Sequence, residues 1–177
     1  MSEIYNLSEY KFSRDEGVFF DTNVWINLHF PHPNSKKRAS SYSRAFQKIL
    51  SARSRIFIDV IVLSEFVNVF IKMEQREFTG STYDYKSFRR SSDFVQVANA
   101  LGIYLSKIFH HATKIGTEFV EIDGSILITG LQTQSCDFND LIIAETCKRS
   151  NLKLITDDRD FADLDVSIIT ANSALLP

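Results

Sequence analysis

The chain has 177 residues, 44% of them apolar and 24% charged, which fits one soluble globular domain with an ordered core. The two cysteines, Cys136 and Cys147, form no C-x-x-C pair, so the sequence predicts neither a disulfide framework nor a zinc site. It shows no apolar signal region and no apolar run long enough to span a bilayer. We therefore expect a cytoplasmic protein without a membrane partner.

Basic residues are concentrated in the first part of the chain. The net charge is −2, but residues 1–110 carry +4 and residues 111–177 carry −6. Between Pro31 and Ile58 there are seven basic side chains and no acidic one: Lys36, Lys37, Arg38, Arg44, Lys48, Arg53 and Arg55. This asymmetry is typical of a protein that draws an anionic polymer toward a metal site. A solvated helix face would have the same composition, and the charge pattern leaves both interpretations open.

The first predicted elements lie between residues 17 and 55. Gly17–Phe20 is an apolar run typical of a buried strand, and it ends directly at Asp21. A short helix or turn is expected through Leu28, and two prolines predict a loop at 29–34. Apolar residues at helical spacing among basic ones then predict an amphipathic helix from Ser35 to about Arg53.

A second strand and two long helices are predicted next. Residues 55–58 form the strand, and Asp59 is expected to cap the helix that follows it. Polar residues and Gly80 predict a loop from Thr79 to Ser92. Ser92 is expected to cap a second helix that extends to about His110. The apolar stripe of the first helix comprises Val62, Phe66, Val69, Phe70 and Met73.

The last third of the chain alternates again between helices and strands. Residues 118–123 are compatible with a strand or a loop, and helices are predicted at 125–134 and 139–149. Strands are predicted at 152–156 and 166–170. Such alternation predicts an α/β fold with a mainly parallel sheet. Right-handed crossovers would place helices on both faces of that sheet.

Four acidic residues occupy informative places in this pattern. Asp21 directly follows one strand and Asp158 follows another by two residues, so both belong to the carboxyl edge where parallel sheets bind ligands. Glu65 lies within an apolar helix, and Asp140 lies in the first turn of the helix at 139–149. Clustered carboxylates repel one another unless cations are bound. Oxygen ligands without histidine or cysteine favour Mg²⁺ or Mn²⁺ over zinc.

The same residues resemble the PIN domain family, and within it the VapC-like toxin ribonucleases. Four blocks in order carry the resemblance: VFFDTNVWINL, VLSEF, DFNDLIIAETC and LKLITDDRDF, whose acids match Asp21, Glu65, Asp140 and Asp158. The resemblance implies a three-layer α/β/α sandwich around a mainly parallel five-stranded sheet, in one domain over residues 1–177. The stretch at about 79–113 looks like an extended helical segment.

The resemblance also implies an activity. It predicts an endoribonuclease that cleaves single-stranded RNA by water attack, with Mg²⁺ or Mn²⁺ held by those four acids as catalytic residues and metal ligands. Structured RNA is a further expected partner, as are a cognate antitoxin protein and a second copy of the chain in a homodimer. We expect Lys36, Lys37, Arg38 and Arg44 to contact the backbone phosphates of the RNA.

Several neighbouring residues have more than one interpretation. Asp137 competes with Asp140 for the third ligand position, and Asp157 is expected to be solvated. Tyr42 and Phe88 are candidates for stacking on unpaired bases, and histidines are expected in surface or loop positions. The candidate accessory residues are Thr22, Asn23, Asn68, Asp137 and Asp160.

Two other function classes remain open. A non-catalytic PIN-like module could bind RNA or protein, although the four intact acids argue against it. A flap- or DNA-directed nuclease would also use an acid cluster, but the net charge of −2 and the lack of a helix-hairpin-helix pattern disfavour it. A P-loop nucleotide hydrolase is disfavoured because the chain has no G-x-x-x-x-G-K-[ST] motif.

Overall fold

A computed structural model describes residues 3–30, 36–79, 84–116, 122–132 and 137–176. Within these residues one parallel sheet has six strands in the order β1-β6-β5-β2-β3-β4. The strands are β1 (Ile4–Asn6), β2 (Gly17–Phe20), β3 (Arg55–Ile58), β4 (Ala112–Lys114), β5 (Lys153–Ile155) and β6 (Ile168–Thr170).

The expected count of five strands was wrong, since the described residues contain six. Strand β1 was not predicted because three residues are too few to show an alternating pattern, and its pairing with β6 is what holds it extended. Strand β4 follows helix α5 (Asp93–His111) directly, before the ambiguous stretch at 118–123. Residues 118–121 of that stretch lie outside the described residues.

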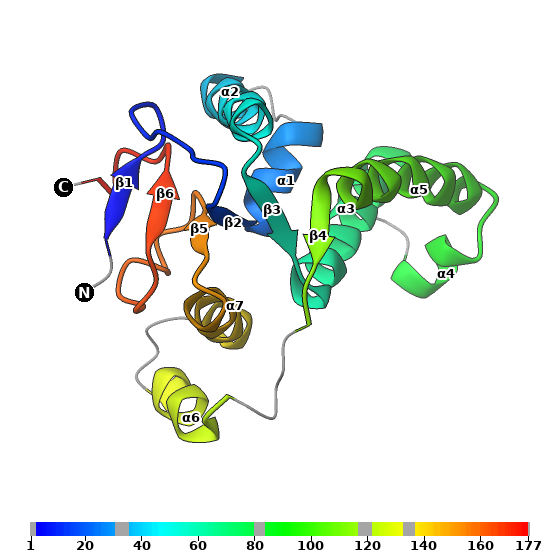
Figure 1. The fold of residues 1–177 in the computed structure, drawn as a ribbon. Helices are drawn as coiled ribbons and strands as arrows, with labels where there is room; N and C mark the ends of the chain where they lie inside the picture. The colour runs from blue at the N-terminus through cyan, green and yellow to red at the C-terminus, as the bar shows by residue number, and fades with distance from the viewer. Residues whose placement is uncertain (1–2, 31–35, 80–83, 117–121, 133–136, 177) are drawn as a thin grey trace.

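Helices cover both faces of the sheet, as the pattern of alternation predicted. The fold is a three-layer α/β/α sandwich, with α1 and α2 on one side of the sheet and α6 and α7 on the other (Figure 1). The helices are α1 (Thr22–His29), α2 (Lys36–Ala52), α3 (Val60–Thr79), α4 (Tyr85–Arg89), α5 (Asp93–His111), α6 (Gly124–Gln132) and α7 (Phe138–Arg149).

Two local predictions about the middle of the chain were wrong. The stretch expected to be a loop between Thr79 and Ser92 contains the short helix α4, which Asp84 caps by accepting hydrogen bonds from two backbone amides. Ser92 stands at the N-terminus of α5 but makes no side-chain cap hydrogen bond, because its backbone is already helical. The predicted cap at Asp59 is confirmed, since its carboxylate accepts a hydrogen bond from the Val62 amide at 2.9 Å.

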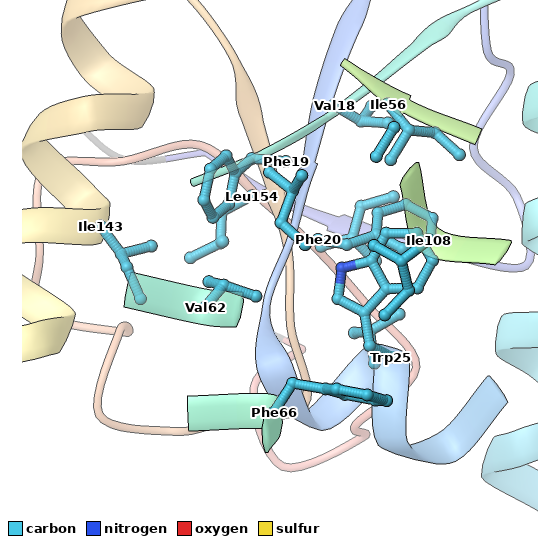
Figure 2. Close-up of a cluster of buried hydrophobic side chains, with 14 of the residues drawn as sticks. Val18, Phe19, Phe20, Trp25, Ile56, Val62, Phe66, Ile108, Ile143 and Leu154 are labelled. Atoms are coloured by element: carbon cyan, nitrogen blue, oxygen red, sulfur yellow. The ribbon is translucent and has the colours of Figure 1, made fainter. Parts of the chain in front are cut away.

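The central strand β2 is buried on both faces, which explains its uninterrupted apolar sequence. Figure 2 shows Phe19 on the side of Ile143, which belongs to α7, and Phe20 on the side of Trp25, which belongs to α1. The Phe20 and Trp25 rings are 5.0 Å apart between centroids. Burial of each such side chain stabilises the fold by roughly 2–3 kcal/mol. The strand that ends at Asp21 is therefore held firmly in the core.

Chain direction in the sheet creates one favoured position for a site. From β2 the chain moves outward through β3 to β4, then returns to the other side of β2 and continues through β5 to β6. The order reverses between β2 and β5, and such switch points leave a crevice at the carboxyl ends of the strands. Among the described helices, none is both long enough and apolar enough to cross a membrane.

Candidate metal centre

Asp21 and Thr156 leave the two strands that flank the switch point. Phe20 of β2 pairs with Ile155 of β5, and the next residue on each strand is Asp21 and Thr156 respectively. The register continues for one more step, because the Asp21 amide donates a hydrogen bond to the Ile155 carbonyl oxygen at 3.1 Å. The sheet itself therefore brings together residues that lie 135 positions apart.

The Asp21 carboxylate is buried, with only 5% of the residue exposed, and it accepts three hydrogen bonds. Oδ1 accepts from the Thr22 amide at 2.6 Å, which caps α1. Oδ2 accepts from the Thr156 hydroxyl at 2.6 Å and from Asn23 Nδ2. Such donors offset part of the cost of burying a carboxylate and fix its direction.

The Thr156 hydroxyl uses its full hydrogen-bonding capacity. It donates a hydrogen bond to Asp21 Oδ2. Its oxygen accepts hydrogen bonds from Asn23 Nδ2 at 3.1 Å and from the Asp158 amide at 3.0 Å. No role for Thr156 was predicted from the sequence. A hydroxyl at the end of a strand, two residues before an acid, was the available signal. Thr156 links the turn that carries Asp158 to the carboxylate of Asp21.

Glu65 reaches the same place from α3, which starts at the carboxyl end of β3. Thr22 Oγ1 donates a hydrogen bond to Glu65 Oε2 at 2.8 Å, so the threonine after Asp21 binds the second acid. Thr22, a candidate accessory residue, thus binds a carboxylate, and its hydroxyl oxygen also lies 3.5 Å from the Val62 carbonyl oxygen. The first turn of α1 thus contacts two of the four predicted acids.

The third acid lies on α7, where two aspartates have separate roles. Asp137 is the N-cap, and its Oδ1 accepts from the Asn139 and Asp140 amides at 2.8 and 3.1 Å. Asp140 is half-buried in the first turn of the helix, and its charge interacts with those of Asp21 and Asp158. The capping geometry favours Asp140 over Asp137 as the group directed at the cluster.

Asp158 is exposed and sits in a turn just beyond β5. Its Oδ1 accepts a hydrogen bond from the Asp160 amide at 3.1 Å, while its own amide is held by Thr156. Asp160 itself is exposed. Asp158 is therefore positioned through its backbone, with its carboxylate at the solvent side of the crevice.

Burial and repulsion show that the four predicted acids share one electrostatic environment. Burial is the main reason that the pKa of Asp21 rises to about 7, and the charges of Glu65 and Asp158 raise it further. Hydrogen bonds from Thr156 and Thr22 act in the opposite direction. Burial likewise raises the pKa of Asp140 to about 7, with added repulsion from Asp137, Asp21 and Asp158. Acids from three other segments of the chain therefore interact electrostatically with Asp21.

The donor set fits a hard divalent cation. Within the part of the chain that the structure describes, no three carboxylate, imidazole or thiol groups already stand close enough to hold one ion. The carboxylates nevertheless interact across the crevice, and positive charge between them would reverse the repulsion that raises the pKa values of Asp21 and Asp140. Oxygen-only donors of this kind suit Mg²⁺ or Mn²⁺.

Asp157, which was expected to be solvated, is instead held in a partly buried network. Its side chain is only 9% exposed and forms an ion pair with Arg38 of α2 at 2.6 Å. Tyr42 donates to Asp157 Oδ1 at 3.0 Å, and Asn23 Oδ1 accepts from the Asp157 amide at 3.1 Å. The sequence could not show this, because Arg38 and Asp157 lie 119 positions apart.

These positions also bear on several other predicted contacts. Arg38 was expected to bind phosphate, but in this structure its guanidinium is engaged by Asp157. Tyr42 and Phe88 cannot stack on bases as proposed, since each is 1% exposed. Asn68 is exposed on α3.

The basic and histidine residues are also now placed. Lys36, Lys37 and Arg44 are exposed on α2, where Arg44 donates to the hydroxyls of Ser40 and Ser41 at 3.1 and 3.3 Å. His29 is neither a surface nor a loop residue, because it ends α1 and packs against Trp25 and Tyr104.

Comparison with known proteins identifies the family that shares this fold. The sequence model of the family described as "PIN domain" matches residues 18–167. The crystal structure of VapBC2 from Rickettsia felis, bound to a DNA fragment from their promoter, aligns with a TM-score of 0.58 and 20% identity over 87% of this chain and 98% of that chain.

A second solved structure, PAE2754 from Pyrobaculum aerophilum, aligns with a TM-score of 0.51 and 16% identity over 97% of this chain and 94% of that chain. At these identities the two structures show a shared fold alone. No curated protein matches the sequence significantly.

Proposed function

Because this chain belongs to the PIN domain family, whose members are generally nucleases, we propose that it is a Mg²⁺- or Mn²⁺-dependent endoribonuclease that cleaves single-stranded RNA in the cytoplasm. We propose further that residues 1–177 act as one nuclease domain, with the helical segment at about 79–113 as an addition to it. The observation that carries the proposal is the convergence of Glu65, Asp140 and Asp158 on the buried carboxylate of Asp21.

In this proposal each acid has its own means of support. Asp21 is fixed by three donors and would form the inner wall of the metal site. Glu65, held by Thr22, and Asp140, on the first turn of α7, would close it on either side, while Asp158 faces the solvent. A bound divalent cation would polarise the phosphate and lower the pKa of the attacking water. Water then adds to phosphorus as the bond to the leaving sugar oxygen breaks.

The accessory residues have supporting rather than ligating roles in this proposal. Asn23 binds both Asp21 and Thr156 through its amide nitrogen and the Asp157 amide through its oxygen, so it joins the two strand ends. Asp160 would reach a cation only through water, and Asp137 serves chiefly as the cap of α7. Outer partners of this kind set ligand orientation and tune metal affinity.

RNA would approach from the side of α2, whose basic residues are free of acidic neighbours in sequence. We propose that Lys36, Lys37 and Arg44 contact phosphates without reading base sequence. Arg38 would contact phosphate only if it left Asp157, since the two are paired at 2.6 Å.

The test is cleavage of an end-labelled single-stranded RNA by the purified chain with Mn²⁺ or Mg²⁺. We expect cutting that EDTA stops and that Asp21→Asn abolishes. Asp15→Asn is the matched control, because Asp15 is exposed and precedes β2 at the opposite edge of the sheet. Intact cleavage by Asp21→Asn would remove the site from the proposal. Metal binding without cleavage of any RNA would favour the non-catalytic binding module.

We also propose a biological setting, supported by the shared fold with the toxin–antitoxin complex VapBC2. The chain would be the toxin of such a pair, inhibited by a cognate antitoxin protein and active as a homodimer. The exposed apolar residues Ile126, Ile128, Leu131 and Phe138 on α6 and α7 support an association surface. Growth arrest by the wild-type chain but not by Asp21→Asn in a bacterial host would support the toxin role. Light scattering would give the oligomeric state.

A further inference from the structure

A basic pocket lies on α2, apart from the acids of the metal centre. It has a volume of about 360 Å³ and is formed between α2 and the residues that follow β1 and β6. Three cationic side chains line it, Lys37, Arg44 and Lys48, and its lining contains no acidic residue. A concave surface with one sign of charge concentrates field and favours an anionic ligand.

The three cations share one face of α2. They are seven and four residues apart, which places them on the same side of an α-helix, and together they extend over about 16 Å of its axis. The hydroxyl of Ser41 lies between them and adds a neutral donor to the pocket. The face is therefore an ordered row of donors along the helix.

Local hydrogen bonds hold two of these cations at the pocket. Arg44 donates to the hydroxyls of Ser40 and Ser41, and Lys48 Nζ donates to the Ser8 carbonyl oxygen at 3.1 Å. Lysine and arginine have further donors beyond these contacts. Neither Arg44 nor Lys48 forms an ion pair with any carboxylate that the structure describes. Their charge is thus available to an outside anion.

The same helix links this pocket to the metal centre. Arg38, next to Lys37 in sequence, pairs with Asp157, which stands between Thr156 and Asp158. A chain of phosphates that enters the crevice at Asp158 would therefore meet Lys37 first and then Arg44 and Lys48 along α2. A strand with regularly spaced charges matches a row of cations better than a single small anion does.

We infer that the pocket between α2 and the β1 and β6 ends binds backbone phosphates of the RNA strand outside the scissile bond. The inference rests on the proposed ribonuclease function and extends it by adding a second contact with the substrate, built from Arg44 and Lys48 together with Lys37. It gives the strand a direction across the protein, from the acids at the switch point along α2 toward its C-terminal half.

The test measures binding of single-stranded RNA to the full chain carrying Asp21→Asn, so that binding is separated from cleavage. Two lengths are compared, a 15-nucleotide RNA and a tetranucleotide, in Arg44→Gln/Lys48→Gln and in the parent. The control is Lys72→Gln/Arg76→Gln, an exposed basic pair on α3 with the same spacing of four. Arg44→Lys/Lys48→Arg keeps the charge, and thermal unfolding confirms that each variant is folded.

We expect the 15-nucleotide RNA to bind about tenfold more weakly to the Arg44→Gln/Lys48→Gln variant. The slope of log affinity against log salt should fall by roughly 1.4, because each phosphate contact on a single strand contributes about 0.7. The tetranucleotide, the control pair and the charge-keeping variant should be unchanged. An equal loss for both RNA lengths, or no loss for the long RNA, overturns the inference.

The two proposals fail in different ways. Cleavage by the wild-type chain tests the ribonuclease function, and binding by the Asp21→Asn chain tests the pocket. If the wild-type chain cleaves RNA but the Arg44→Gln/Lys48→Gln substitutions leave RNA binding by the Asp21→Asn chain unchanged, the pocket alone is refuted. Length-dependent loss of binding without any cleavage by the wild-type chain supports the pocket and refutes the nuclease activity.

Discussion

The Thr156 hydroxyl donates a 2.6 Å hydrogen bond to Asp21 Oδ2, which joins the ends of β5 and β2 at the point where the strand order reverses. The same oxygen accepts a hydrogen bond from the Asp158 amide at 3.0 Å. One buried side chain therefore holds the inner acid by its carboxylate and the outer acid by its backbone. This makes Thr156 a positioning residue for the proposed reaction.

Replacing Thr156 with valine keeps the shape and removes the hydroxyl. We expect a loss of about 1–3 kcal/mol in stability, because buried partners lose their hydrogen bonds. Cleavage should fall roughly 10- to 100-fold through misplaced ligands. The acid limb of the pH–rate profile should shift to higher pH in the variant, because the Thr156 hydroxyl lowers the pKa of Asp21 in the wild-type chain. Thr170→Val, at the buried end of β6, is the matched control and should lose stability without that pH shift.

Stability of the metal-free protein should depend on the charge of Asp21. Its pKa in the fold is about 7, against 3.8 for an aspartate side chain exposed to water. Between these values the folded chain binds more protons than the unfolded chain, so stability falls as pH rises from about 4 to about 7. Asp140 acts in the same direction. The Asp21→Asn variant should show a smaller fall in melting temperature between pH 5 and pH 8, and an identical pH profile would contradict the assignment.

Divalent cations should stabilise the folded chain, and more strongly at high pH. Mn²⁺ at 100 times its dissociation constant would add about 2.7 kcal/mol. At pH 5 protons compete for Asp21 and Asp140, whose pKa values are about 7, so the stabilisation should be smaller there than at pH 8. Thermal unfolding with and without Mn²⁺ measures this, with Asp21→Asn as the variant that should respond least. Equal stabilisation at the two pH values would argue against carboxylate ligation.

Loss of the Arg38–Asp157 pair should disturb the turn that carries Asp158. Arg38→Met leaves the Asp157 carboxylate, 9% exposed, with Tyr42 as its remaining side-chain donor. Arg38 is 54% exposed, so solvent screens the pair and we expect a cost of only about 1 kcal/mol. A double-mutant cycle with Asp157→Asn isolates the pair, and Lys36→Met serves as an exposed control on the same helix. A coupling energy of zero would show that the contact does not hold the turn.

His29→Phe should leave stability unchanged or raise it by about 1 kcal/mol at pH 7. Within the described residues, the buried Nε2 of His29 has no hydrogen-bond partner, and the ring packs against Trp25 and Tyr104. Burial lowers the pKa of His29 to about 4, so the wild-type chain loses stability as pH falls from 6.5 toward 4. The advantage of the phenylalanine variant in urea unfolding should therefore grow at pH 5. A stability loss at both pH values would indicate that His29 has a partner.

Much of the fold could be predicted because its signals are local. The apolar run before Asp21, the helical periodicity after Asp59 and the strands near 55 and 154 each lie within a few residues of sequence, and all of them appear in the structure. The convergence of Asp21 and Asp158 on one sheet edge also followed from strand direction, which any parallel sheet imposes. In the structure the charges of Glu65 and Asp158 act on Asp21, and those of Asp21 and Asp158 act on Asp140.

The sequence by itself predicted the alternation of strands and helices, the parallel sheet and four candidate acids. The tertiary structure alone decided which side chains hold those acids in place. Thr156 meets Asp21, Arg38 meets Asp157 and Thr22 meets Glu65 only after distant strands and helices pack together. Hydrogen bonds and ion pairs act over a few ångströms and carry no sequence periodicity, so nothing local marks the two partners in advance. Strand β1 could not be predicted for the same reason, because its three residues are held by pairing with β6, which is distant in sequence.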